Sequence, residues 1–167
     1  MQALPLFVAL GIVAGLAAVL YNSLLLGTLA AMDRLSHWPV EMRAALIGAA
    51  VGVLAWFVPD LVGGGDDITQ RTLAGGATLS ALLLAFLLRF GLGAISYAAA
   101  TPGGLFAPML VLGTQLGLFF GILCRAAFPE MAVDTTAFAV VEMAAFFPGV
   151  VQAPVTGIAL VIEMTAS

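Results

Sequence analysis

Long apolar stretches alternate with short polar or glycine- and proline-rich breaks along the whole chain. About seven helices are predicted from this pattern, at roughly 4–32, 41–58, 67–75, 78–98, 106–127, 135–147 and 152–165. A helix needs about 20 apolar residues to cross a bilayer, so several of these are too short to span it alone. Unequal, broken helices are typical of transporters, in which helix ends inside the membrane hold ions.

The helix predicted from about residue 135 has recognisable signals at both ends. Asp134 or Thr135 can cap its start, because a short polar side chain there accepts a hydrogen bond from a free backbone N–H. Pro148-Gly149 is expected to stop it near residue 147, since proline lacks a backbone N–H and crowds the preceding turn. The next helix is predicted to begin near Gln152.

Glycines spaced four residues apart mark helix faces that a neighbouring helix can approach closely. Three such patterns occur, Gly11/Gly15, Gly48/Gly52 and Gly113/Gly117/Gly121. The triple pattern predicts that the helix at 106–127 packs deep among its neighbours.

Composition restricts the chain to one broad class. Hydrophobic residues make up 63% and charged residues 8% of 167 residues, whereas soluble domains carry about 25% charged residues. The chain has five arginines, no lysine and a net charge of −4, so it lacks the basic surface that binds nucleic acid. It is predicted to be an all-α polytopic membrane protein in the lipid bilayer. No nucleophile–base pair, metal-ligand cluster or phosphate loop is found, so neither an enzyme nor a cofactor or metal site is expected.

The segment Gly103–Pro108 is the strongest functional signal. Two glycines interrupt an apolar region, and a new helix is predicted to begin directly after them. The first turn of a helix has free N–H groups and the positive end of the helix dipole, and both attract anions. Irregular backbone within a bilayer is tolerated where it lines a cavity. The sequence therefore predicts half of an anion-conduction site.

Other polar residues admit two interpretations each. His37 is read as an interfacial residue rather than a proton relay, and Asp66 or Asp67 as a helix cap in a glycine-rich turn rather than a metal ligand. Cys124 is read as a small packed apolar residue. Arg89 remains open between a structural partner for a carboxylate and a charge that lines a pathway.

Three stretches together resemble the CLC family of chloride channels and proton/chloride antiporters. Gly104-Leu105-Phe106-Ala107-Pro108 matches the family's GxFxP anion-site motif, and Leu112-Gly113-Thr114 with Gly117 matches the helix that follows it. Gln152-Ala153-Pro154-Val155-Thr156-Gly157 through Glu163-Met164-Thr165 is similar to the bacterial RAPxTG…EMT segment. A weaker resemblance extends to residue 1.

The resemblance implies a fold with two inverted halves, in which helix N-termini meet around chloride. The N–H groups of Leu105 and Phe106 would donate to the ion, and the ring edge of Phe106 would lie near the pathway. Gly104 would allow close backbone approach, and Pro108 would fix the first helical turn. The implied anion-binding set is Gly104, Leu105, Phe106, Ala107 and Pro108.

Residues 1–167 are interpreted as part of a CLC-like transmembrane domain, the second half without the final helices. The chain contains no GSGIP and no GREGP or GKEGP motif, and those motifs, with the anion-binding tyrosine and the proton-transfer glutamate, are expected outside it. Glu142 stands where the family has glycine, Gln152 where it has arginine, and Pro148 where it has a small residue. We read Glu142 as lying at the membrane edge or as protonated, rather than as a gating glutamate.

The resulting hypothesis is chloride transport by a fragment of a CLC-type channel or H+/Cl− antiporter subunit. The resemblance also implies a homodimer and a multi-pass location in a bacterial inner membrane. The alternative is a truncated membrane module with a structural or interaction role and no transport. Motifs in the flanking sequence would discriminate between the two.

Overall fold

The computed structural model describes residues 4–34, 37–59, 79–99, 106–129 and 134–165. These described ranges form α-helices and contain no strand. The helices are α1 (Leu4–Arg34), α2 (Val40–Phe57), α5 (Leu79–Ala98), α6 (Phe106–Ala127), α7 (Thr135–Val151) and α8 (Pro154–Thr165). The helix expected at 67–75, the glycine-rich turn with Asp66 and Asp67, and residues 103–105 lie outside the described ranges.

Four of these helices, α1, α2, α5 and α6, are long and apolar enough to cross a membrane. The prediction of an all-α membrane protein is thereby confirmed. The 31 residues of α1 measure roughly 46 Å at 1.5 Å per residue. Because that exceeds a hydrocarbon core of about 30 Å, α1 is expected to lie tilted in the bilayer.

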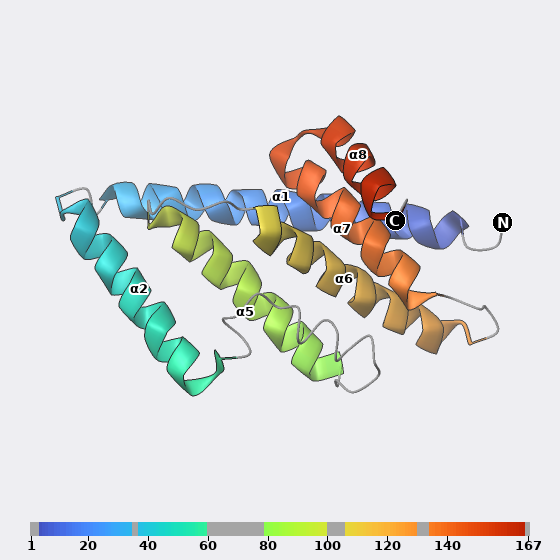
Figure 1. Ribbon diagram of the computed structural model, residues 1–167, viewed down its shortest axis with the longest axis horizontal. Helices are drawn as coiled ribbons and strands as arrows, with labels where there is room; N and C mark the ends of the chain where they lie inside the picture. The colour runs from blue at the N-terminus through green and yellow to red at the C-terminus, as the bar shows by residue number, and fades with distance from the viewer. Residues whose placement is uncertain (1–3, 35–36, 60–78, 100–105, 130–133, 166–167) are drawn as a thin grey trace.

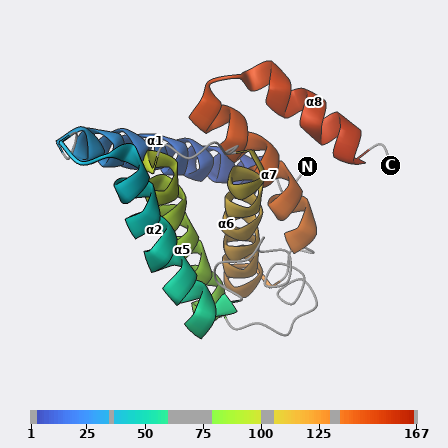
Figure 2. The same cartoon turned by 60° about the vertical axis from the view of Figure 1, so that its left-hand side comes forward.

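The long helix α1 runs along the length of the molecule, and α2, α5 and α6 lie in a row on one side of it (Figure 1). A second view keeps the same row, with α2 outermost beside α5, and places α8 on the far side of α7 (Figure 2). Helix α7 packs against α6, α1 and α8. Helix α6 therefore lies between α5 on one side and α7 on the other.

The largest hydrophobic core joins α1, α5, α6 and α7. Tyr21 lies at its centre, with its ring 4.8 Å from that of Phe90 and 5.8 Å from that of Phe146, centroid to centroid. The cluster comprises Ala18, Tyr21, Leu25, Phe90, Ala94, Met109, Leu112, Phe146, Phe147 and Val150. Met109 and Leu112 belong to the first two turns of α6, so this core anchors the helix close to its start.

The triple-glycine face of α6 is a packing face, as predicted. A β-carbon at Gly113 would lie 2.6 Å from Met143 Cα, and one at Gly121 would lie 3.1 Å from Thr135 Cα. The distance at Gly113 leaves no room for a side chain, and the distance at Gly121 is tighter than an ordinary contact, so the backbones of α6 and α7 lie close together along this seam. By contrast, a β-carbon at Gly11, Gly15, Gly48 or Gly52 would meet nothing within 4 Å in the described structure, so those two faces pack against none of the described helices.

The expectation that Pro148-Gly149 ends the helix is wrong, because α7 continues to Val151 with Pro148 inside it. The lost N–H affects one hydrogen bond only, close to the end of the helix. The true end is made by Gln152, which adopts the left-handed conformation (φ 59°) while its N–H donates to the carbonyl of Pro148. The Pro148 ring packs against Gly157 of α8. At the other end, Asp134 caps α7 and accepts from the N–H of Thr136 at 2.9 Å.

Candidate anion site at the start of α6

Helix α6 begins at Phe106, at the position that the sequence pattern predicted. Its first turn contains Phe106, Ala107 and Pro108, and all three are exposed. The N–H groups of a first turn have no acceptor within the helix, and proline is tolerated there because it has no N–H to lose. Gly104 and Leu105, the other two residues of the predicted set, lie outside the described ranges.

Phe106 is held by an aromatic contact with α7. Its ring and that of Phe147 meet nearly at right angles, with centroids 5.0 Å apart and planes at 79°. Phe147 is 8% exposed and Phe106 is 45% exposed. One ring therefore belongs to the core while the other remains open at the start of α6, which fixes the direction of the helix start.

The charge that this end of α6 offers comes from its backbone. The first turn holds neither an acidic nor a basic residue, and Arg125 lies in the last turn. The positive end of the helix dipole, equivalent to roughly half an elementary charge, is thus not neutralised by an acid in that turn. Such an end attracts an anion but binds it more weakly than a full positive side chain would. Weaker binding suits a site that must release its ion.

The remaining candidate residues lie apart from the start of α6. His37 is exposed beside Trp38, with ring centroids 6.2 Å apart, as expected of an interfacial histidine. Cys124 is buried within the apolar packing of α6, which confirms that interpretation. Arg89 is half-buried on α5, and both of its interpretations remain open. No group of three or more potential metal ligands occurs in the described ranges.

Glu142 and Gln115 are fully buried, with no exposed surface. Neither carboxylate oxygen of Glu142 has a hydrogen-bond partner among the described residues, and the same holds for the amide atoms of Gln115. Glu142 is thus enclosed by protein midway along α7. Enclosure by protein does not set the depth of a residue in the bilayer, so both interpretations, membrane-edge and protonated, stay predictions. Gln115 was missed in the sequence, although an amide in the middle of a largely apolar helix is a signal that could have identified it.

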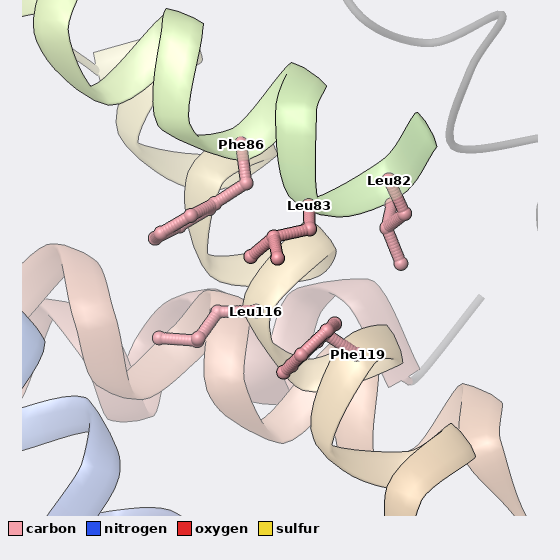
Figure 3. A pocket seen from close by; sticks show the side chains of 5 residues that line it. All are labelled: Leu82, Leu83, Phe86, Leu116 and Phe119. Atoms are coloured by element: carbon pink, nitrogen blue, oxygen red, sulfur yellow. The ribbon is translucent and has the colours of Figure 1, made fainter. Parts of the chain in front are cut away.

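A small hollow lies between α5 and α6, with about 260 Å³ of empty space that includes the space open to the outside. Leucine and phenylalanine side chains from the two helices point toward one another across it (Figure 3). Its lining consists of Leu82, Leu83, Phe86, Leu116 and Phe119. Because these side chains offer no hydrogen-bond donor, the hollow does not compete with the start of α6 as an anion site.

Comparison with known proteins assigns the family. The model of the family described as "Voltage gated chloride channel" matches residues 1–167, which is the whole chain. The chain belongs to the voltage-gated chloride channel (CLC) family. This family assignment confirms the resemblance carried by the GxFxP, glycine-helix and Ala-Pro-x-Thr-Gly segments.

Curated CLC relatives cover nearly all of the chain, but the chain covers only part of them. The H(+)/Cl(-) exchange transporter ClcA of Vibrio cholerae serotype O1 is 38% identical over 170 residues, which are 99% of this chain and 36% of that protein. ClcA of Cronobacter sakazakii is 39% identical over 164 residues, covering 96% of this chain and 35% of that protein. The chain therefore spans little more than a third of the length of these relatives.

A solved CLC structure shares the fold. The "X-ray crystal structure of a slow cyanobacterial Cl-/H+ antiporter" superposes with a TM-score of 0.86 at 30% identity, covering 98% of this chain and 39% of that one. The arrangement of the described helices is thus that of a CLC antiporter. Together with the four apolar helices, this establishes a multi-pass integral membrane protein.

Proposed function

We propose that this chain is the part of a CLC-type transporter that holds chloride, through backbone N–H groups at the start of α6, while the ion crosses the membrane. The similar curated proteins are described as H(+)/Cl(-) exchange transporters, and the similar solved structure as a Cl-/H+ antiporter. Both descriptions support chloride as the transported ion of this chain as well.

The observation that carries the proposal is the position at which α6 begins. The helix starts at Phe106, within the GxFxP motif, and its first turn is exposed while Met109 and Leu112 are buried directly behind it. A firmly anchored helix with an open N-terminal end presents its N–H donors in a fixed direction. Fixed donors stabilise an anion without reorganising around it, which is the general advantage of helix N-termini as anion sites.

Each residue of the set has a distinct proposed role. The N–H groups of Leu105, Phe106 and Ala107 donate to the ion. Gly104 lets the backbone approach it, and Pro108 stabilises the first turn without requiring an acceptor. The ring of Phe106 borders the pathway, where its orientation is fixed by Phe147.

The proposal includes the setting of the site. Residues 1–167 are the second part of a CLC transmembrane domain, and the complete subunit pairs with a second copy in a bacterial inner membrane. An antibody against residues 33–42 tests the domain assignment on native membranes. A polypeptide close to three times the 17.1 kDa of this chain supports it, whereas a 17.1 kDa band supports the alternative, a membrane module that does not transport.

The site itself is tested by chloride efflux from liposomes that contain the native polypeptide. Gly104→Val blocks backbone approach and is expected to lower apparent chloride affinity about tenfold, the equivalent of one charge-assisted hydrogen bond of about 1.5 kcal/mol. Phe106→Ala is expected to lower flux without unfolding the protein. Phe57→Ala is the matched control, because Phe57 is 76% exposed on α2. Wild-type flux from both site variants would remove the assignment.

A further inference from the structure

Glu142 is a carboxylate enclosed in the seam between α6 and α7. It lies midway along α7 and has no exposed surface. A β-carbon placed on Gly117 of α6 would lie 2.8 Å from Glu142 Cβ, and one on Gly113 would lie 2.9 Å from the Glu142 backbone oxygen. The glycine face of α6 is therefore what makes room for α7 at this residue.

The helices on either side of the seam bring no compensating charge to Glu142. Along α6, residues 113–121 pack on α7 and contain no titratable side chain. Helix α1 is aligned with α7 by two contacts, the stacked rings of Phe7 and Phe138 and the approach of Ala18 to Gly149. Between those two contacts, residues 7–18 of α1 are apolar throughout.

The other titratable groups of the packed elements lie elsewhere. Tyr21 of α1 contacts Phe146, one turn beyond Glu142 on α7. Gly121 of α6 faces Thr135, the first residue of α7, and Cys124 lies one turn further from Glu142 than Gly121 does. The titratable side chain of α8 is Glu163, which is exposed. Within the described ranges, both oxygens of Glu142 thus have neither a hydrogen-bond donor nor a cation to balance a charge.

An ionised carboxylate in such surroundings is strongly disfavoured, because a buried charge without a partner loses its hydration and gains nothing in exchange. The neutral acid avoids most of that penalty. We propose that Glu142 is a proton-binding site: it carries a proton while the α6–α7 seam is closed, and loss of that proton forces the seam to open. The site is separate from the start of α6, and it stands or falls independently of chloride binding there.

Infrared spectroscopy of the native polypeptide in liposomes tests the site directly. A neutral carboxylic acid has a carbonyl-stretch band that a carboxylate lacks, so the wild-type spectrum minus that of Glu142→Gln isolates the proton on this residue. We expect the band at neutral pH and its loss at alkaline pH. Glu142→Met, neutral and of similar length, replaces the glutamine variant if that variant does not fold. Absence of the band from the difference spectrum at neutral pH would overturn the proposal.

The pH dependence of unfolding gives a second readout that a merely structural residue would not change. If the native seam holds a proton that the unfolded chain releases, stability falls as pH rises, by up to about tenfold in the unfolding equilibrium constant per pH unit. Unfolding in detergent is expected to show this slope in the wild type and in the control Glu41→Gln, which removes an exposed carboxylate of α2. Glu142→Gln is expected to lose it, and a wild-type slope in that variant would contradict the proposal.

Discussion

The backbone of Gly117 in α6 lies so close to α7 that a β-carbon at position 117 would sit 2.7 Å from Ala139 Cα. The atom it would meet belongs to the backbone, which cannot turn aside as a flexible side chain can. Any larger residue at position 117 therefore has to push the two helices apart. The packing of α6 on α7 is the most extensive between any two described helices. It depends on glycine at position 117, which has no side chain.

Gly117→Val is expected to destabilise the protein by about 1–3 kcal/mol, the usual range for overpacking a close contact. Chemical unfolding in detergent micelles, followed by circular dichroism, measures the effect. Gly91→Val is the matched control on α5, where a β-carbon would meet nothing within 4 Å in the described structure. Equal stability of the two variants would show that the α6–α7 contact is looser than described.

Tyr21 and Gly93 are expected to be coupled. A β-carbon at Gly93 would lie 2.8 Å from the Tyr21 hydroxyl oxygen, and this buried oxygen has no hydrogen-bond partner in the described ranges. Gly93→Ala alone is expected to be destabilising, whereas in a Tyr21→Phe background, which removes the oxygen, the same change is expected to be nearly neutral. A double-mutant cycle on unfolding free energies measures the coupling, expected at about 1 kcal/mol, and additive effects would rule it out.

Phe147 is expected to act on the proposed anion site without touching the ion. Phe147→Leu keeps most of the buried apolar volume but removes the edge-to-face contact with Phe106, which contributes about 0.5–1.5 kcal/mol beyond burial. We expect a modest loss of stability and weaker chloride binding, because the Phe106 ring is then less restrained. Calorimetric titration with chloride measures the affinity. Phe138→Leu, whose ring stacks on Phe7 instead, is expected to leave that affinity unchanged.

Apolar replacements of Gln115 and of its neighbour Thr114 are expected to change the stability of the protein in opposite directions. Gln115→Leu removes a buried amide without a described partner and is expected to stabilise the protein by about 1–3 kcal/mol. Thr114→Val removes a hydroxyl that donates to the Leu110 carbonyl at 2.9 Å and is expected to destabilise it by about 1 kcal/mol. Thermal unfolding in detergent compares the two. A destabilised Gln115→Leu would show that this amide has a partner elsewhere in the assembled protein.

Helix positions were largely predictable, because they depend on local signals. The lengths of the apolar stretches and the polar residues that flank them predicted the bounds of α1, α2, α5 and α6 to within about two residues. Asp134 correctly predicted the start of α7, which it caps. The end of α7 was predicted wrongly from Pro148, because a proline near the end of a helix removes only one hydrogen bond and need not stop the helix. That end is decided by Gln152, whose left-handed conformation no local rule for glutamine predicts.

The candidate site was predictable in part. The GxFxP pattern located the start of α6 at Phe106, since glycine and proline punctuate helices in a way that sequence reveals. The contact of Phe106 with Phe147 was not predictable, because 41 positions separate the two residues in the chain and only the packing of α6 on α7 brings them together.

The sequence by itself determined the membrane class, the positions of most described helices and the family motifs, because each depends on the residue types within a short stretch. The tertiary structure alone decided which glycine faces are in contact and which polar side chains are enclosed. Gly113, Gly117 and Gly121 meet α7, whereas Gly11 and Gly15 meet none of the described helices, although the spacing is the same. Glu142 could have faced lipid, water or protein. It became a buried acid because burial is a property of what packs around a residue, and no stretch of α7 specifies its neighbours.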